Sequence, residues 1–323
     1  MRTRDQTHRA PVLAAYSPDT GAREPVEFGV AASRVTGAPL VIVVVVDSGE
    51  HSIHRVTDGK PVIPASVAAA VQHLENELAT RGVAAEVRTF EDSTAARGLA
   101  RAIDEFSPEL VVLGTTSRGA KGALLLGTTA ERVIHLSPCP VAVVPHGYRR
   151  PDDGVKVIGA AYTPKPEAED ALAAAVSLAR SGGVELRVLT VLDPKFAHEE
   201  AHSLMAEHRR EVGTDAKLAS RVRYDLEKQT RARVTELAGD LPATVDVITD
   251  EPARALVAAS AHLDLLVMGS RALGTRRAVI LGSVSRRVID ESSCPVIVIP
   301  RDTTDKRDEL LGDVESHAPQ AGE

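Results

Sequence analysis

Aromatic residues are scarce in this chain. Phe, Tyr and Trp together make up 2% of its 323 residues, and Trp is absent. Since the hydrophobic fraction is 43%, the interior must be built from aliphatic side chains. Basic residues are too few to balance the acidic ones, and the formal net charge is −7. A nucleic-acid-binding protein uses a basic surface and stacking aromatic rings, so we expect no nucleic-acid partner.

Cysteine is equally rare. The two cysteines, Cys139 and Cys294, lie in the matching contexts Ser-Pro-Cys-Pro and Ser-Ser-Cys-Pro, and neither belongs to a Cys-x-x-Cys motif. A metal or redox site is therefore not indicated. Buried free thiols in a reducing cytosol are the simplest interpretation.

Long apolar segments are missing as well. The longest apolar run, Pro39–Val46, is far shorter than the roughly 18 residues that a membrane-spanning helix needs. Residues 1–10 are polar and charged, and no secretory signal is visible among them. We therefore expect a soluble, cytoplasmic protein without a membrane partner.

What the chain does contain is an internal repeat. Residues 109–145 align without a gap with residues 264–300, at an offset of 155 residues. The matched pairs include glycines and cysteines: Gly114 with Gly269, Gly127 with Gly282, and Cys139 with Cys294. Two copies of one domain are the natural interpretation of such a repeat.

The beginnings of the two halves match too. Residues 14–18 align with residues 160–164 at an offset of 146. The offsets of 155 and 146 differ by nine residues, which indicates an insertion within the second copy. We predict one domain over 8–148, a second over 154–301, and a disordered acidic tail over 302–323.

Each copy is predicted to alternate strands and helices. Aliphatic runs with little polar alternation are typical of strands buried on both faces of a parallel sheet. The sequence therefore predicts an α/β fold with two tandem doubly wound (Rossmann-like) parallel-sheet domains. The expected strands are Val12–Tyr16, Leu40–Val46, Ala85–Phe90, Leu110–Leu113 and Val141–Val144, then Val155–Tyr162, Leu186–Leu192, Val245–Thr249, Leu265–Met268 and Val296–Ile299. The expected helices are Arg23–Val35, Ala65–Arg81, Thr94–Glu105, Glu167–Arg180 and Pro252–Ala261, one within Phe196–Leu237, and one starting near Thr128 and near Ser283.

The loop after the fourth strand of each copy carries the clearest chemical signal. It begins at Gly114 or Gly269 and closes on Gly127 or Gly282, where a helix starts. Ligands bind beyond the carboxyl ends of such strands, and a helix start offers an anion unpaired N–H groups and a favourable dipole. Ordinary helix capping would explain one such loop, and the repetition of the whole loop in both copies weakens that explanation. Hydroxyl and basic residues accompany the loops: Thr128, Thr129, Ser283 and Ser285, with Arg118, Lys121, Arg271, Arg276 and Arg277.

These residues resemble the universal stress protein family. Its ATP-binding members carry Gly-x-x-Gly, nine further residues and then Gly-Ser/Thr between the fourth strand and the fourth helix. The resemblance covers nearly the whole chain. The first and third glycines of the motif, the latter with its hydroxyl, fall on Gly114, Gly127-Thr128, Gly269 and Gly282-Ser283.

Two positions depart from the family pattern in the same way in both copies. The middle glycine of the motif falls on Ser117 and on Ala272. The aspartate that contacts the adenosine at the end of the first strand falls on Ser17 and on Thr163. A hydroxyl still forms hydrogen bonds, but it lacks the charge and the stronger acceptors of a carboxylate. The resemblance thus implies an intact phosphate half and a weakened adenosine anchor.

Other residues near the implied pocket carry less information. The valine that meets adenine through its backbone matches Val45 and Val191, and a backbone contact tolerates most side chains. Tyr16 and Tyr162 lie beside the missing aspartate, where they could stack on a base or pack into the core. Packing is the favoured role for a tyrosine near a strand end.

The resemblance implies a non-catalytic regulatory module of the stress response that binds ATP, or another phosphorylated ligand, with Mg²⁺ possible beside the nucleotide. As family pairs do, the two copies would pack through the apolar edges Val141–Val144 and Val296–Ile299. The result would be an intramolecular pseudo-dimer, or a homodimer of such chains. An interaction scaffold that no longer binds ATP is the alternative, and the loss of the aspartate in both halves favours it. No Walker A motif is present, so at most a weak ATPase is expected.

One metal motif occurs outside the repeat. His198-Glu199-Glu200-Ala201-His202 matches His-Glu-x-x-His, which on a helix would place both imidazoles on one face. It lies in the inserted segment among charged residues, and no third ligand is apparent, so a solvated helical face is favoured. We predict that metal analysis of the purified protein finds no stoichiometric zinc. Stoichiometric zinc together with zinc-dependent hydrolysis would instead support a zinc enzyme.

Overall fold

The computed structural model describes residues 9–47, 63–115, 126–194, 215–272 and 279–300. The first half contains β1 (Val12–Tyr16), α1 (Glu24–Thr36), β2 (Leu40–Asp47), α2 (Ala65–Thr80), β3 (Ala85–Asp92), α3 (Ala95–Phe106), β4 (Leu110–Gly114), α4 (Thr128–Leu136) and β5 (Val141–Val144). The second half contains β6 (Val157–Ala161), α5 (Pro166–Gly182), β7 (Glu185–Leu192), α7 (Asp215–Ala238), β8 (Ala243–Thr249), α8 (Pro252–Ser260), β9 (Leu265–Gly269), β10 (Arg271–Ala272), β11 (Val279–Ile280), α9 (Ser283–Glu291) and β12 (Val296–Ile299).

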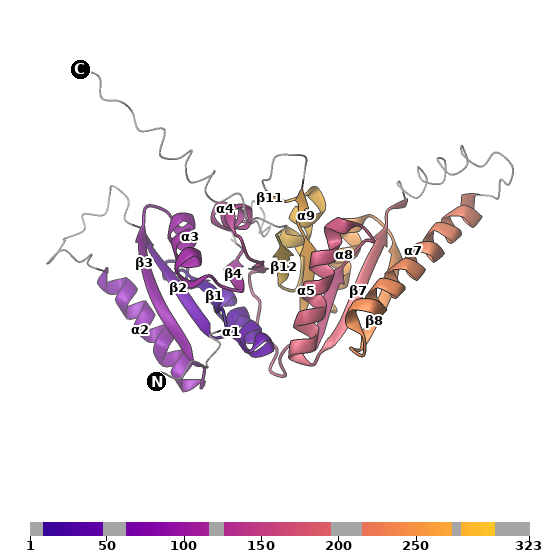
Figure 1. Ribbon diagram of the computed structural model, residues 1–323. Helices are drawn as coiled ribbons and strands as arrows, with labels where there is room; N and C mark the ends of the chain where they lie inside the picture. The colour runs from indigo at the N-terminus through magenta and orange to yellow at the C-terminus, as the bar shows by residue number, and fades with distance from the viewer. Residues whose placement is uncertain (1–8, 48–62, 116–125, 195–214, 273–278, 301–323) are drawn as a thin grey trace, which may run out of the picture.

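The strands form a central sheet with helices on both of its faces, which gives a three-layer α/β structure (Figure 1). Helices α1, α2, α5 and α7 share one buried cluster with the sheet, and α3, α4, α8 and α9 share the other. The aliphatic runs form the central strands, and every residue of β5 and of β12 is buried. The predicted doubly wound fold is confirmed.

All the main strands belong to one 10-stranded sheet in the order β3-β2-β1-β4-β5-β12-β9-β6-β7-β8. Pairing is parallel within each half, whereas β5 and β12 pair antiparallel, with Ala142 opposite Ile297. The predicted contact between the two apolar edges is therefore confirmed. It relates the halves by a pseudo-twofold axis, which we call the pseudo-dyad.

The expected elements agree closely with the observed ones, and two differences stand out. The second copy has a 24-residue helix, α7, where the first has the 16-residue α2, so part of the extra chain lengthens this helix. The loop after β9 holds a short antiparallel hairpin, β10–β11, which the pattern of apolar residues did not predict. The motif His198–His202 and the tail 302–323 lie outside the described residues.

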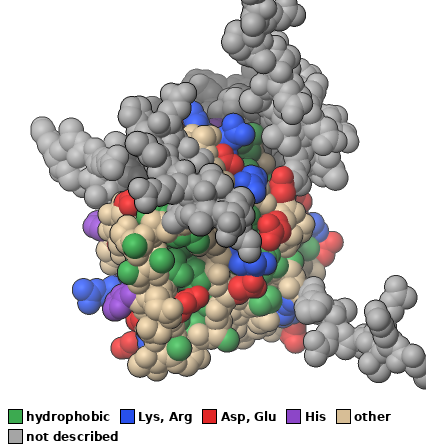
Figure 2. Space-filling model, turned by 90° about the vertical axis from the view of Figure 1, so that its left-hand side faces the viewer, with side chains coloured by type: hydrophobic (Ala, Val, Ile, Leu, Met, Phe, Trp, Pro, Cys, Tyr) green, Lys and Arg blue, Asp and Glu red, His purple; other side chains and the backbone are tan. Residues whose placement is uncertain are grey.

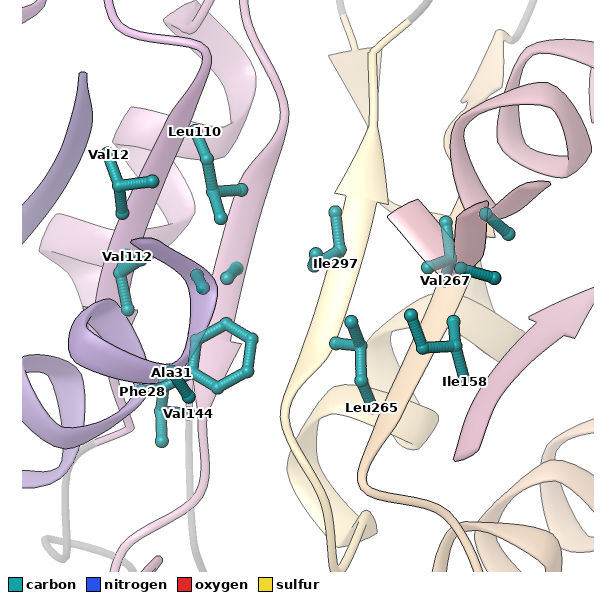
Figure 3. Close-up of a cluster of buried hydrophobic side chains, with 14 of the residues drawn as sticks. Val12, Phe28, Ala31, Leu110, Val112, Val144, Ile158, Leu265, Val267 and Ile297 are labelled. Carbon is teal, nitrogen blue, oxygen red and sulfur yellow. The ribbon is translucent and has the colours of Figure 1, made fainter. Parts of the chain in front are cut away.

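One buried cluster on one face of the sheet contains side chains of both halves, and Figure 3 labels several of them. Val12, Val112 and Val144 of the first half share a cluster with Ile158 and Ile297 of the second, and each of these is at most 1% exposed. On this face of the sheet, aliphatic side chains of the two halves therefore form one shared core.

The exposed edge at β3 and α2 carries charged side chains of both signs between small apolar areas (Figure 2). No helix within the described parts of the chain is long and apolar enough to span a bilayer.

Core packing at the β5–β12 contact can be tested with one buried and one exposed isoleucine. Ile297 is 1% exposed and Ile63 is 39% exposed. We expect Ile297→Ala to lower the free energy of unfolding by about 2–5 kcal/mol, because it leaves a cavity. Ile63→Ala should change it by less than about 0.5 kcal/mol. Chemical denaturation measures both, and equal effects would contradict the described interface.

Candidate functional site

The strand order places a switch point in each half. β1 lies between β2 and β4, and β6 lies between β7 and β9, so the chain crosses to the opposite face at these two places. Ligands of open parallel sheets bind at the carboxyl ends of the strands beside such points. β4 ends at Gly114 and β9 at Gly269, as predicted.

Gly114 has a packing role that the motif did not reveal. A Cβ atom added there would lie 3.1 Å from Cγ of Pro25, in the first turn of α1. That distance is tighter than an ordinary van der Waals contact, so the approach of α1 favours glycine at this position whether or not a ligand binds. The adjacent Thr115 bonds to β5 and the linker, donating its N–H to the Val144 carbonyl and accepting from the His146 N–H through Oγ1.

The helix starts of α4 and α9 are built alike. Each has a glycine N-cap in extended conformation, with φ −65° and ψ 153° at Gly127 and φ −65° and ψ 162° at Gly282, and a glycine has no side chain that could cap the helix. By contrast, Thr94 caps α3 and Glu251 caps α8 through their own oxygens. Within the described parts of the chain, no side chain therefore accepts from the first-turn N–H groups of α4 or α9, and the helix dipole favours an anion at such a position.

The predicted hydroxyl residues occupy different environments. Thr128 and Ser283 are exposed at the first helical position, Thr129 is half-buried, and Ser285 is buried. Only the two first-position hydroxyls thus combine full exposure with a place at the open helix start. Ser117 lies outside the described residues, and Ala272 is placed by its backbone, opposite Val279 in the β10–β11 hairpin.

The two predicted valines sit where a backbone contact is feasible. β1 ends at Tyr16, opposite Val44, so Val45 extends beyond the last rung on that side while it still pairs with Phe90 of β3. The side chain of Val45 packs onto α3, where a Cβ atom at Gly98 would lie 2.4 Å from it. In the second half β6 ends at Ala161, and Val191 likewise extends beyond it.

Ser17 and Thr163 lie at the ends of β1 and β6, and both are exposed. The Ser17 carbonyl accepts from the Gly21 N–H at 3.0 Å, and the Thr163 carbonyl accepts from the Lys165 N–H at 2.6 Å. Both carbonyls are thus used in turns that follow the two strands.

The two tyrosines belong to the core. Tyr16 is 7% exposed, and the guanidinium carbon of Arg23 lies 5.0 Å from its ring centroid. Tyr162 is 3% exposed and donates its hydroxyl hydrogen to Oε1 of Glu169 at 2.7 Å. Burial, together with this carboxylate, raises the pKa of Tyr162. The favoured packing role is therefore the observed one, and neither ring is presented for stacking on a base.

Arg23 is a basic residue that the motif analysis missed. It directly precedes α1, near the end of β1, and its Nη2 atom pairs with Glu77 at 2.9 Å. Its Nη1 atom is buried and has no hydrogen-bond partner among the described residues. Its proximity to Tyr16 in space could not be read from a loop motif that lies about 90 residues further along the chain.

A separate cleft of about 460 Å³ lies beside the linker between the halves, lined by residues 145–149, Pro151, Leu263, Asp264 and residues 291–294. Burial raises the pKa of Cys294 to about 12 and that of Tyr148 to about 12. The cleft does not include the starts of α4 and α9, so it is distinct from the predicted site. Among the described residues, no group of three or more His, Cys, Asp or Glu side chains could hold a metal ion.

The fold defines a class: a tandem doubly wound α/β protein whose two halves each carry a switch point. A family profile described as the universal stress protein family matches residues 9–145 and 154–300. The chain therefore belongs to the universal stress protein family.

Comparison with individual proteins agrees with this assignment. Universal stress protein Rv2319c of Mycobacterium tuberculosis is 30% identical over 208 residues, covering 61% of this chain and 66% of the relative. Universal stress protein Rv2005c of the same organism is 33% identical over 192 residues, covering 59% and 61%. The chain thus spans less than two thirds of the length of these relatives.

Solved structures show the same fold. A putative universal stress protein from Pseudomonas aeruginosa has a TM-score of 0.65 at 15% identity, covering 94% of this chain and 98% of that one. The protein PA1789 of Pseudomonas aeruginosa PAO1 has a TM-score of 0.66 at 15% identity, covering 94% of this chain and 98% of that one.

The thiols offer a test of the packing, since Cys294 is buried, as expected, whereas Cys139 is only half-buried. Burial raises the pKa of Cys139 as well as that of Cys294. A raised pKa lowers the thiolate fraction at a given pH, to about 10⁻⁴ at pH 8 for a thiol with a pKa near 12. We expect an aromatic disulfide reagent to react slowly with the native protein and rapidly with both thiols after denaturation. Rapid reaction of both thiols in the native protein would contradict the described packing.

Proposed function

We propose that this protein is a non-catalytic regulatory module that binds an adenine nucleotide, ATP in the first instance, or another phosphorylated ligand. The observation that carries the proposal is the pair of open helix starts, at Gly127-Thr128 and Gly282-Ser283, beside the two switch points. Each offers first-turn N–H groups, a positive helix end and an exposed hydroxyl to a phosphate. An acidic protein needs such local features, since its overall field repels anions.

The base and ribose would lie toward the ends of β1 and β2, or of β6 and β7. There the backbone beyond Val44 or Leu189 is available past the last rung of the neighbouring strand. Ser17 and Thr163 would supply neutral hydroxyl contacts in place of a carboxylate, so we expect the adenosine half to contribute less affinity. Mg²⁺ would be carried mainly by the phosphates of the nucleotide.

Regulation would follow from a shift in conformational populations. A ligand that binds one arrangement of loops 115–126 and 270–281 more tightly would favour that arrangement and change the surface offered to partners. Because β5 and β12 of the same chain pair with each other, one chain forms a pseudo-dimer. This pseudo-dimer would act in the cytoplasm as part of the stress response.

An interaction scaffold that no longer binds nucleotide is the second candidate. The absence of a carboxylate at both Ser17 and Thr163 favours it, because both halves would have lost the same anchor. In that case the sheet and its helices would serve as a binding surface alone.

Calorimetric titration of ATP into the full chain, with and without Mg²⁺, separates the two candidates. Gly127→Val and Gly282→Val place a branched side chain at each helix start, where the backbone angles are allowed for valine. Ala69→Val, on the exposed face of α2, is the matched control. We expect saturable binding that each glycine variant reduces by about one site of the two, that the double variant abolishes, and that the control retains.

An absence of ATP binding would favour the scaffold. If neither heat nor a thermal shift is seen at millimolar ATP, the nucleotide proposal is wrong and the scaffold becomes the better description. Binding that survives the double variant would place the ligand elsewhere.

A further inference from the structure

Helix α9 of the second half contacts the start of α4 in the first half. Asp290 Oδ1 accepts a hydrogen bond from the backbone N–H of Leu126 at 2.8 Å, across 164 residues of sequence. Leu126 is 4% exposed and directly precedes the N-cap Gly127. A carboxylate from one domain thus holds the last residue of the candidate phosphate loop of the other.

A second contact fixes the first turn of the same helix. Arg286 Nη1 lies 2.8 Å from Oε1 of Glu131, and its Nε lies 3.4 Å from Oδ2 of Asp290. The N–H of Glu131 in turn donates to the carbonyl of Gly127. We call Arg286 and Asp290 the α9 clamp, because they hold α4 on both sides of its N-cap.

The contact is asymmetric, although the fold is repeated. At the offset of 155 residues, Glu131 matches Arg286 and His135 matches Asp290. Pairing of unlike domains therefore brings opposite charges together across the pseudo-dyad, whereas two copies of the same domain would oppose Glu to Glu or Arg to Arg. Attraction in the mixed pair and repulsion in the identical pairs favour the pairing of the first domain with the second. Figure 1 shows α4 and α9 next to each other on the same face, with β11 between them.

The side chains of the clamp are partly shielded. The Asp290 side chain is 18% exposed, that of Arg286 is 39% exposed and that of Glu131 is 36% exposed. A bond from a carboxylate to a backbone N–H is charge-assisted and stronger than a neutral one, and partial burial reduces competition from water. The contact can therefore restrain the helix start more than an exposed ion pair would.

We propose that Arg286 and Asp290 are positioning residues for the ligand site of the first domain. They fix the start of α4, where a phosphate would bind, so the affinity of the first site depends on the second domain. This inference rests on the proposed function above. At the position that matches Asp290, the first half has the imidazole of His135, so the two residues differ in charge and chemistry.

Hydrogen–deuterium exchange on the full chain tests the contact without any ligand. In Asp290→Ala we expect the amide of Leu126 to exchange about tenfold faster, because its acceptor is gone. Asp290→Asn keeps a carbonyl acceptor and should restore most of the protection. Glu291→Ala is the matched control, since that neighbouring carboxylate pairs with Arg287 of its own helix. Circular dichroism and thermal unfolding verify that each variant is folded.

ATP titration then tests the consequence at each site separately. With the second site blocked by Gly282→Val, Asp290→Ala should weaken ATP binding at the first site about tenfold, and Asp290→Asn should recover it. With the first site blocked by Gly127→Val, Asp290→Ala should leave the second site unchanged.

The outcomes distinguish the two proposals. Unchanged exchange at Leu126 in Asp290→Ala overturns the positioning role, whether or not ATP binds. Faster exchange with unaltered affinity at the first site overturns it too. If the unmodified chain binds no ATP, the proposed function fails, and the exchange result alone decides whether the clamp positions α4.

Discussion

The antiparallel pairing of β5 with β12 is the contact on which the rest of the structure depends. Each half ends its own strand order in a short, wholly buried aliphatic strand, and such an edge is prone to pair with another strand when it is left open. Pairing the two edges closes both and joins two five-stranded sheets into one. It also sets the separation and orientation of everything attached to these strands, including the two helices that precede them.

The candidate sites inherit their geometry from that arrangement. α4 leads into β5 and α9 leads into β12, so the pairing of the strands brings both helix starts near the pseudo-dyad. The glycine N-caps of α4 and α9 offer no side-chain acceptor to the first-turn N–H groups, whereas Thr94 and Glu251 cap α3 and α8 with their side chains. Packing also favours glycine at position 114 of the motif, because Pro25 of α1 approaches Gly114 closely.

Duplication followed by divergence explains how one fold can carry two unlike surfaces. Glu131 and Arg286 hold the same place in the two copies, yet they carry opposite charges and bind each other. The repeat therefore supplies the architecture, while the differences between the copies determine which domain faces which. The ends of β1 and β6 show the reverse case, since Ser17 and Thr163 depart from the family pattern in parallel.

The sequence by itself determined the repeat, the class of fold, the bounds of most strands and helices, and the glycines that start α4 and α9. The strands, the helices and their starts could be predicted because strand burial and helix initiation depend on patterns within a few neighbouring residues. It also favoured packing for Tyr16 and Tyr162. Only the tertiary structure decided which residues of one half touch the other: Asp290 reaches Leu126 across 164 residues, and Arg23 lies over Tyr16. No periodicity encodes such contacts, because they depend on how whole elements pack once the sheet has closed.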